Sequence, residues 1–180
     1  MIFNQFLFLF VFLPLVTVLF YLPGFERHRP LVLIISSFVF YSVSGTIHAA
    51  VLAIEILWVY TIISNDRIVK NYWRLAVAVI PLFLMLFYFK YLNFFLGQLF
   101  GFQQNSSGFS LLENSILPAG ISFFTFQLAS VAIDRFRGEI PAFTGLKRFT
   151  IYISLFPQLV AGPIIRFKQI SDDLANLEKF

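Results

Sequence analysis

Hydrophobic residues occur along the chain in long blocks that short polar segments separate. A helix needs about 20 mostly apolar residues to cross a lipid bilayer. Five blocks approach this length, and they cover residues 6–22, 31–43, 47–63, 75–100 and 116–133. The pattern predicts an all-α, polytopic transmembrane protein with about five spanning helices.

A sixth block, residues 149–165, contains Pro157 and the pair Gly162 and Pro163, which interrupt a helix. If this block crossed the bilayer, Arg166 and Lys168 would lie on the outer side. A re-entrant segment would return both residues to the inner side. Irregular backbone at membrane depth survives only where protein buries it or where it lines a wet cavity. We favour the re-entrant arrangement, and the crossing one stays open.

The charges of the loops predict the orientation. Residues 23–30, 64–74 and 134–148 contain Lys or Arg, whereas residues 101–115 contain neither. The positive-inside rule therefore places the first three loops on the cytoplasmic side and the last one outside. It follows that Ser44 and Gly45 form the outer turn of a hairpin, and that the N-terminus lies outside.

Composition excludes several classes of protein. Hydrophobic residues make up 59% of the 180 residues, and only 12% are charged, against about 25% in soluble domains. This excludes a disordered chain and argues against an ordinary soluble domain. The chain has no Cys and only two His, His28 and His48, so we expect no metal site. The net charge is +4, but the basic residues stand in short loops, so we expect no nucleic-acid partner.

The last segment, residues 170–180, predicts the start of an amphipathic helix. Ser171 is the expected N-cap, and Asp172 and Asp173 follow in the first turn. No C-cap follows, so we expect residues 1–180 to form a single membrane-embedded portion of a longer protein.

Two charged residues stand inside hydrophobic blocks. Glu55 lies near the middle of the third block, where an unpaired carboxylate costs roughly 2.5–3.5 kcal/mol. It either faces an inner cavity or is satisfied by Ser, Tyr or Lys90 of a neighbouring helix. Lys90 itself, among aromatic residues, either extends to the outer interface or stands over a substrate path.

The fifth block carries two contrasting faces at helical spacing. One face is a seam of small residues that would let another helix approach closely: Ser122, Thr125, Ala129 and Ala132. The other face is polar: Gln127, Ser130 and Asp134. The polar face either lines a polar interior or makes hydrogen bonds between helices. Gly138 is the expected C-cap of this helix.

Three stretches resemble known sequence elements. Residues 117–127 (LPAGISFFTFQ) resemble the LPxGISFYTF element of the membrane-bound O-acyltransferase family, and residues 133–138 (IDRFRG) resemble its IDVYRG continuation. Residues 156–166 (FPQLVAGPIIR) match its FPQLVAGPIxR element, and residues 37–41 and 89–95 also fit. The bacterial alginate O-acetyltransferase branch is the most similar. Phe124, Arg135 and Phe136 depart from the pattern, so no family role is carried over to them.

The resemblance implies an enzyme that transfers an acyl group, here acetyl, to a hydroxyl. The donor would be a thioester such as acetyl-CoA acting as substrate, with no bound cofactor. The acceptor would be an exopolysaccharide such as alginate, reached directly or through a periplasmic partner protein, and the enzyme would lie in the bacterial inner membrane. The catalytic histidine of the family would lie beyond Phe180, and neither His28 nor His48 matches it. We therefore expect no catalytic residue in residues 1–180 and no activity from them alone.

Under this reading a central tunnel lets donor and acceptor meet, with Arg166 and Lys168 at its cytoplasmic mouth. The candidate tunnel-lining or donor-contacting residues are Glu55, Lys90, Gln127, Ser130, Asp134, Arg166 and Lys168. A non-enzymatic transporter or scaffold subunit is the alternative. A reading frame that continues beyond Phe180 with a His in a later hydrophobic block would favour the enzyme.

Overall fold

The computed structural model describes residues 6–24, 26–43, 45–91, 118, 120–141, 145–161 and 165–175. Within these ranges every regular element is a helix, as the sequence predicts. The elements are η1 (Phe8–Phe12), α1 (Leu13–Tyr21), η2 (Glu26–His28), α2 (Arg29–Ser42), α3 (Thr46–Ile63), η3 (Asp66–Ile68), α4 (Tyr72–Lys90), α7 (Ile121–Arg137), α8 (Leu146–Ser154), α9 (Phe156–Ala161) and α10 (Phe167–Ala175).

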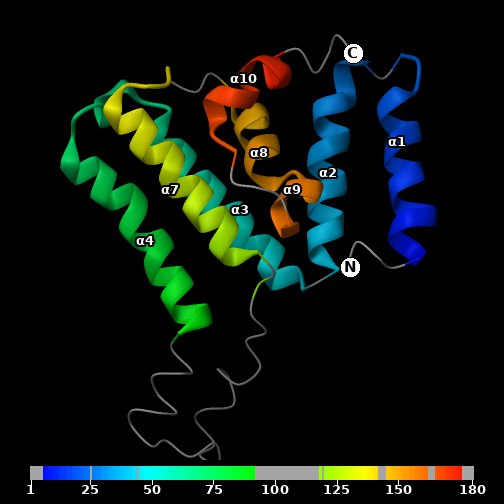
Figure 1. The fold of residues 1–180 in the computed structure, drawn as a ribbon, viewed down its shortest axis with the longest axis horizontal. Coiled ribbons are helices and arrows are strands. Elements are labelled where there is room, and N and C mark those ends of the chain that lie inside the picture. Colours follow the sequence, from blue (N-terminus) through cyan, green and yellow to red (C-terminus); the bar gives the residue numbers. More distant parts are fainter. Residues whose placement is uncertain are drawn as a thin grey trace, which may run out of the picture.

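Successive helices run in alternating directions and pack side by side (Figure 1). The predicted hairpin of the second and third blocks is confirmed, because α2 ends at Ser42 and α3 begins at Thr46. The N-terminal helix ends before Pro23, also as predicted. Most of the core lies where α3 meets α7 and α8, and it includes Leu52, Val59 and Leu128, none of which is exposed.

Four phenylalanine rings fix the N-terminal helix to the rest of the bundle. Phe8 and Phe12 lie four residues apart in η1, a π-helix, and their rings stack with centroids 5.8 Å apart. Both rings contact Phe40 of α2 and Phe156 of α9 at centroid distances of 5.4–6.1 Å. Aromatic pairs in this range add to the hydrophobic gain of burying the rings.

Helix α7 differs from its predicted bounds at its start. The expected block began at residue 116, but the helix starts after Gly120, whose φ of 74° lies in the left-handed region. At the other end the helix continues through Asp134 to Arg137, because Arg135 is buried and not a loop residue. Gly138 ends the helix at a φ of 75° and donates its N–H to the Arg135 carbonyl, so the predicted C-cap is confirmed.

Three of the four residues of the small-residue seam of α7, Thr125, Ala129 and Ala132, are buried in the bundle, and Ser122 is half-buried.

The sixth block is not one continuous helix. Helix α8 stops at Ser154, Leu155 has an extended conformation, and α9 begins at Phe156, next to Pro157. The freed N–H of Phe156 donates to Ser37 Oγ of α2 at 3.2 Å. The next described residue, Ile165, contacts α8, because the Tyr152 hydroxyl donates to its carbonyl at 2.7 Å. Gly162 and Pro163 lie outside the described residues.

The expected start of the last helix is wrong. Helix α10 begins at Phe167, and Ser171 lies inside it, where its hydroxyl donates to the Lys168 carbonyl. The Arg166 N–H donates to the side-chain oxygen of Gln169, which is the interaction of a capping box. This interaction fixes the helix start five residues earlier than expected, with Arg166 and not Ser171 as the N-cap.

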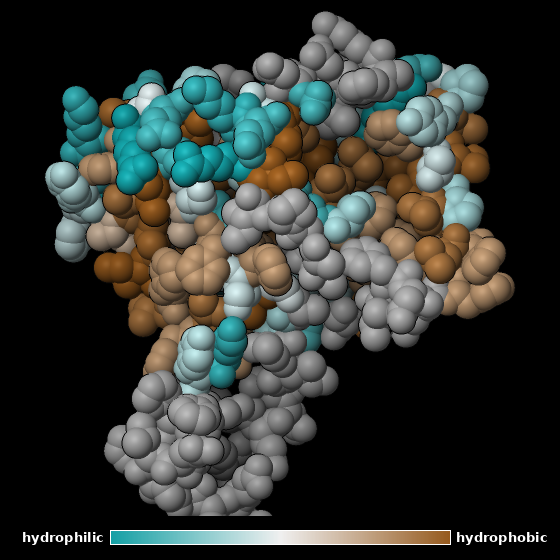
Figure 2. All heavy atoms as spheres, viewed as in Figure 1, coloured by the Kyte–Doolittle hydropathy of each residue, from teal (hydrophilic) through white to brown (hydrophobic). Residues whose placement is uncertain are grey.

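The basic loops gather at one end of the bundle. The connections after α1, α3 and α7, together with α10, lie at the upper end in Figure 1. The Lys70 N–H donates to the Phe136 carbonyl at 2.9 Å, which joins two of these loops. Figure 2 shows hydrophilic residues along this end and hydrophobic residues on the flank below it. The predicted outer loop, residues 101–115, lies outside the described residues.

The expected number of spanning helices is met only in part. In the described residues, α3 and α4 are long and apolar enough to cross a membrane, and Phe8–Tyr21 forms a shorter apolar helix. Helices α2 and α7, with 14 and 17 residues, fall below that length. The described part of the chain therefore contains two helices of clear spanning length, fewer than the five predicted.

Candidate functional site

Helix α7 carries buried polar residues toward the basic end of the bundle. Gln127 is buried and donates its side-chain amide to the Tyr152 carbonyl of α8 at 3.0 Å. Asp134, two turns further along α7, is also buried and interacts electrostatically with Arg166 and Arg137. The structure thus brings three predicted residues, Gln127, Asp134 and Arg166, around Tyr152.

This cluster joins three helices. Tyr152 accepts from Gln127 through its carbonyl and donates through its hydroxyl to the Ile165 carbonyl, just before α10. Its ring packs edge-on against Phe167 with centroids 5.3 Å apart. Tyr152 was not among the predicted residues. Its position in an apolar block, without a charged neighbour in sequence, gave no signal of this role.

Glu55 forms a second polar position, between α3 and α2. The side chain is 4% exposed, and neither carboxylate oxygen has a hydrogen-bond partner in the described part of the chain. The hydroxyl group of Tyr41 on α2 is close enough to interact electrostatically with it. Of the alternatives that the sequence left open for Glu55, a pairing with Lys90 is not among the described interactions, and Lys90 contacts Ser122 instead.

Besides Arg29 Nη1 near the N-terminal helix, three other buried polar atoms also lack a partner among the described residues. They are His48 Nδ1 on α3, Thr125 Oγ1 on α7 and Ser154 Oγ at the end of α8. Burying a polar group without a hydrogen bond is unfavourable by about 1–3 kcal/mol. Such groups are typical of a site that holds water or a ligand, and they lie on the helices that enclose Glu55 and Gln127.

The remaining predicted residues stand apart from these positions. Lys90 is exposed at the end of α4, donates to Ser122 Oγ at 3.4 Å and lies 5.5 Å from the centre of the Tyr91 ring. Ser130 is half-buried on α7, and Lys168 is exposed on α10. The structure therefore does not bring all seven candidates into one site.

Arg135 was set aside in the sequence because it departs from the family pattern. In the structure it is 3% exposed and binds three segments. Its guanidinium donates to the carbonyls of Ile63 and Ile140, both at 3.1 Å, and pairs with Asp66. This arrangement fixes the end of α7 against the loop after α3, so Arg135 has a structural role.

The described residues contain no group of three or more His, Cys, Asp or Glu side chains that could hold a metal ion. The chemistry that the arrangement offers is hydrogen bonding by hydroxyl, amide and carboxyl groups inside an apolar bundle, with cationic side chains at one end. This combination suits a polar substrate that must be shielded from lipid.

Comparison with known proteins finds similar chains. The chain is 37% identical over 184 residues to the "Probable alginate O-acetylase AlgI" of Pseudomonas aeruginosa, covering 96% of this chain and 34% of that protein. It is 36% identical over 191 residues to the protein of the same name from Pseudomonas putida, covering 100% of this chain and 39% of that protein.

A more distant relative is the "Peptidoglycan O-acetyltransferase" of Helicobacter pylori, 25% identical over 210 residues that cover 94% of this chain and 38% of that protein. No protein-family model matches the chain, and no solved structure matches it significantly. The chain spans between about a third and two fifths of the length of these relatives. In its motifs and over nearly its whole length, the chain is therefore similar to the alginate O-acetylases, as the resemblance of its sequence elements predicts.

Proposed function

We propose that this chain is part of a membrane-embedded enzyme that transfers an O-acetyl group toward an exopolysaccharide such as alginate. The observation that carries the proposal is the 32–37% identity to five alginate O-acetylases over 96–100% of the chain. The distant relatives named for peptidoglycan and teichoic acid also transfer acyl groups to cell-envelope polymers by their names. The acceptor is therefore a hydroxyl of an envelope or extracellular polymer.

The proposed topology has five crossing segments and one re-entrant segment in the bacterial inner membrane, with the N-terminus outside. The crossing segments are the continuous helix η1–α1, α2, α3, α4 and α7. The gathering of the basic loops at one end supports this topology, because such loops mark the cytoplasmic side. Helix α8, with nine residues, is about 13 Å long, too short to cross a hydrocarbon core of about 30 Å.

The acyl donor is a thioester such as acetyl-CoA that approaches from the cytoplasmic side. Arg166 and Lys168 stand exposed at the basic end, where they can meet anionic groups of such a donor. The acceptor hydroxyl loses its proton to a general base as its oxygen attacks the thioester carbonyl, and the thiol leaves. The base is a histidine of the longer protein, outside residues 1–180.

The residues of this chain would shape the path along which the two substrates meet. Gln127 and Asp134 orient polar groups at the α7–α8 contact, while Glu55 and Thr125 leave hydrogen-bonding capacity free in the interior. Lys90, at the opposite end of α4 from the basic loops, would meet an acidic polysaccharide or a periplasmic partner protein. Ser130 lies on α7, as Gln127 and Asp134 do, and would line the path.

Deletion of the gene in its own bacterium tests this function. We expect the secreted polysaccharide to lose its ester-bound acetate while its amount and sugar composition stay unchanged. Reintroduction of the full-length gene should restore the acetate. Unchanged acetate in the deletion strain would overturn the proposal, and loss of the polymer itself would point to an export or scaffold function instead.

A further inference from the structure

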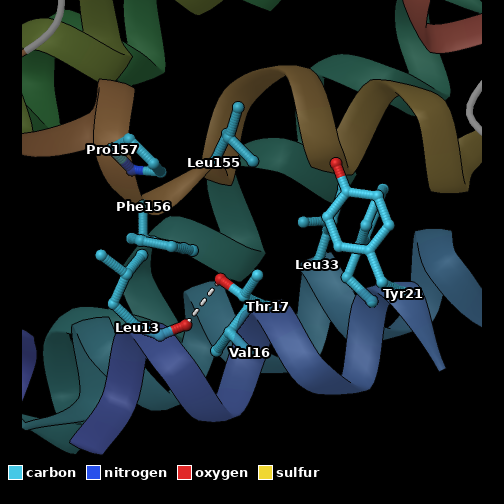
Figure 3. A pocket seen from close by; sticks show the side chains of 9 residues that line it. Leu13, Val16, Thr17, Tyr21, Leu33, Leu155, Phe156 and Pro157 are labelled. Carbon is cyan, nitrogen blue, oxygen red and sulfur yellow. Dashed lines mark hydrogen bonds between the residues drawn. The ribbon is translucent and has the colours of Figure 1, made fainter. Parts of the chain in front are cut away.

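An apolar groove lies between α1, α2 and the break that separates α8 from α9. Its volume is about 280 Å³. Leu13 and Phe156 stand at one end, and Tyr21 and Leu33 stand at the other, so the groove runs along α1 (Figure 3). For comparison, an apolar cavity of about 150 Å³ holds benzene.

The wall of the groove offers almost no free hydrogen-bonding group. Thr17 is one of its few polar side chains, and its hydroxyl is already used, since it donates to the Leu13 carbonyl at 2.8 Å. Tyr21 is 64% exposed and stands at the rim. A groove of this kind suits a hydrocarbon chain and not a polar molecule.

A cation stands at the end of the groove where α1 finishes. Arg29 donates its Nε–H to the Phe20 carbonyl at 3.0 Å, and its guanidinium lies 5.5 Å from the centre of the Phe20 ring, which lines the groove. The side chain is 5% exposed, and its Nη1 has no hydrogen-bond partner in the described residues. Arg27, exposed in η2, adds a second positive charge nearby.

An unpaired guanidinium nitrogen in protein surroundings favours an anionic oxygen as its partner, and phosphate fits the guanidinium geometry. The three residues of η2, which directly precede Arg29, are all exposed. Basic positions between membrane helices on the cytoplasmic side are typical sites for anionic head groups. The positive charge of Arg29 and the apolar groove therefore both indicate a molecule with an anionic head group and a hydrocarbon chain.

We propose that this groove binds one anionic phospholipid, with an acyl chain along α1 between Leu13 and Tyr21 and the phosphate at Arg29. The site rests on the proposed membrane placement, in which η2 lies at the cytoplasmic interface. It does not depend on acyl transfer. The bound lipid would fix α1, whose outer face is largely exposed, to the break between α8 and α9.

Native mass spectrometry of the full-length protein tests the proposal, with phosphatidylglycerol and phosphatidylethanolamine supplied in equal amounts. We expect the wild-type protein to retain phosphatidylglycerol at least about fivefold more than phosphatidylethanolamine, which corresponds to about 1 kcal/mol for a cationic contact. Arg29→Gln should bring the ratio close to one, and Arg29→Lys should keep most of it. The matched control is Arg74→Gln, a basic residue of the same end, which should keep the wild-type ratio.

A second pair of variants tests the groove. Leu13→Trp should fill it and reduce retention of both lipids, whereas Leu15→Trp, on the exposed side of α1, should not. These variants keep the proposal testable if Arg29→Gln fails to fold. Equal retention of the two lipids by the wild type, equal effects of Arg29→Gln and Arg74→Gln, or no effect of Leu13→Trp would overturn it. Because the readout is bound lipid, failure here leaves the acyltransferase proposal intact.

Discussion

The indole N–H of Trp58 donates a hydrogen bond of 3.1 Å to the carbonyl oxygen of Val77. This carbonyl lies four residues before Pro81, which stands inside α4 and has no N–H to donate to it. A side chain of α3 therefore satisfies the backbone group that the proline of α4 leaves free. In lipid, where no water can bind that carbonyl, this contact joins the two helices and makes the proline tolerable.

Trp58→Phe should lower the free energy of unfolding by about 1 kcal/mol, because it leaves the Val77 carbonyl without a donor. In a Pro81→Ala background the restored N–H of residue 81 can take over, so the same change should have less than half of that effect. Thermal unfolding of the four proteins in detergent gives the coupling between the two sites. Trp73→Phe, at a residue that is 78% exposed, is the control and should change little. If Trp58→Phe lowers the stability equally in both backgrounds, the hydrogen bond to the Val77 carbonyl is not the cause of the loss.

Arg135→Ala should lower the free energy of unfolding by about 3 kcal/mol, because it removes charged hydrogen bonds to two carbonyls and leaves them unpaired in a buried place. Arg135→Lys should give an intermediate loss, since one ammonium group cannot reach all three partners. Arg137→Ala serves as the control, because that side chain is 57% exposed, and it should change stability by less than about 0.5 kcal/mol. Similar losses for the two alanine variants would contradict the structural role of Arg135.

Glu55→Met should leave the melting temperature unchanged or raise it, while acetyl transfer by the full-length enzyme should fall at least about tenfold. The physical reason is that an unpartnered buried carboxyl destabilises the fold, and groups of this kind persist where function needs them. Glu139→Gln, at an exposed residue, should affect neither quantity. A marked loss of stability in Glu55→Met would mean that the carboxyl supports the fold, and full activity would mean that it has no function.

The proposed sidedness can be measured with single cysteines, because residues 1–180 contain none. A cysteine at Thr46, exposed at the start of α3, should react with a membrane-impermeant thiol reagent added to spheroplasts. A cysteine at Arg67, in η3 at the basic end, should react only after the membrane is opened. Labelling in the opposite order would reverse the orientation.

The helical elements could be predicted well where hydrophobic length alone decides. The hairpin of α2 and α3 follows from two apolar blocks around Gly45, and Gly138 ends α7 because a left-handed residue is needed there. The bounds failed where a single polar contact decides, since the side chain of Gln169 fixes the start of α10.

The candidate site could be predicted only as a set of polar positions on helix faces. Spacing along α7 correctly grouped Gln127 with Asp134, because both depend on one helical period. Tyr152 and the pairing of Trp58 with Val77 depend on which helices become neighbours, and local sequence does not contain that information. For the same reason the sequence left the partner of Glu55 open between Ser, Tyr and Lys90, and in the structure Lys90 contacts Ser122.

Transfer of acetyl groups across sealed membrane vesicles tests the central claim most directly. Vesicles that carry the full-length protein would receive radiolabelled acetyl-CoA on the cytoplasmic side and a soluble polysaccharide acceptor such as alginate, with any periplasmic partner, on the other side. We predict that ester-bound label, released by hydroxylamine, accumulates on the polymer only when the protein is present. If the protein is folded and the labelled donor is present on one side, but the polymer on the other side stays unlabelled, the account is contradicted.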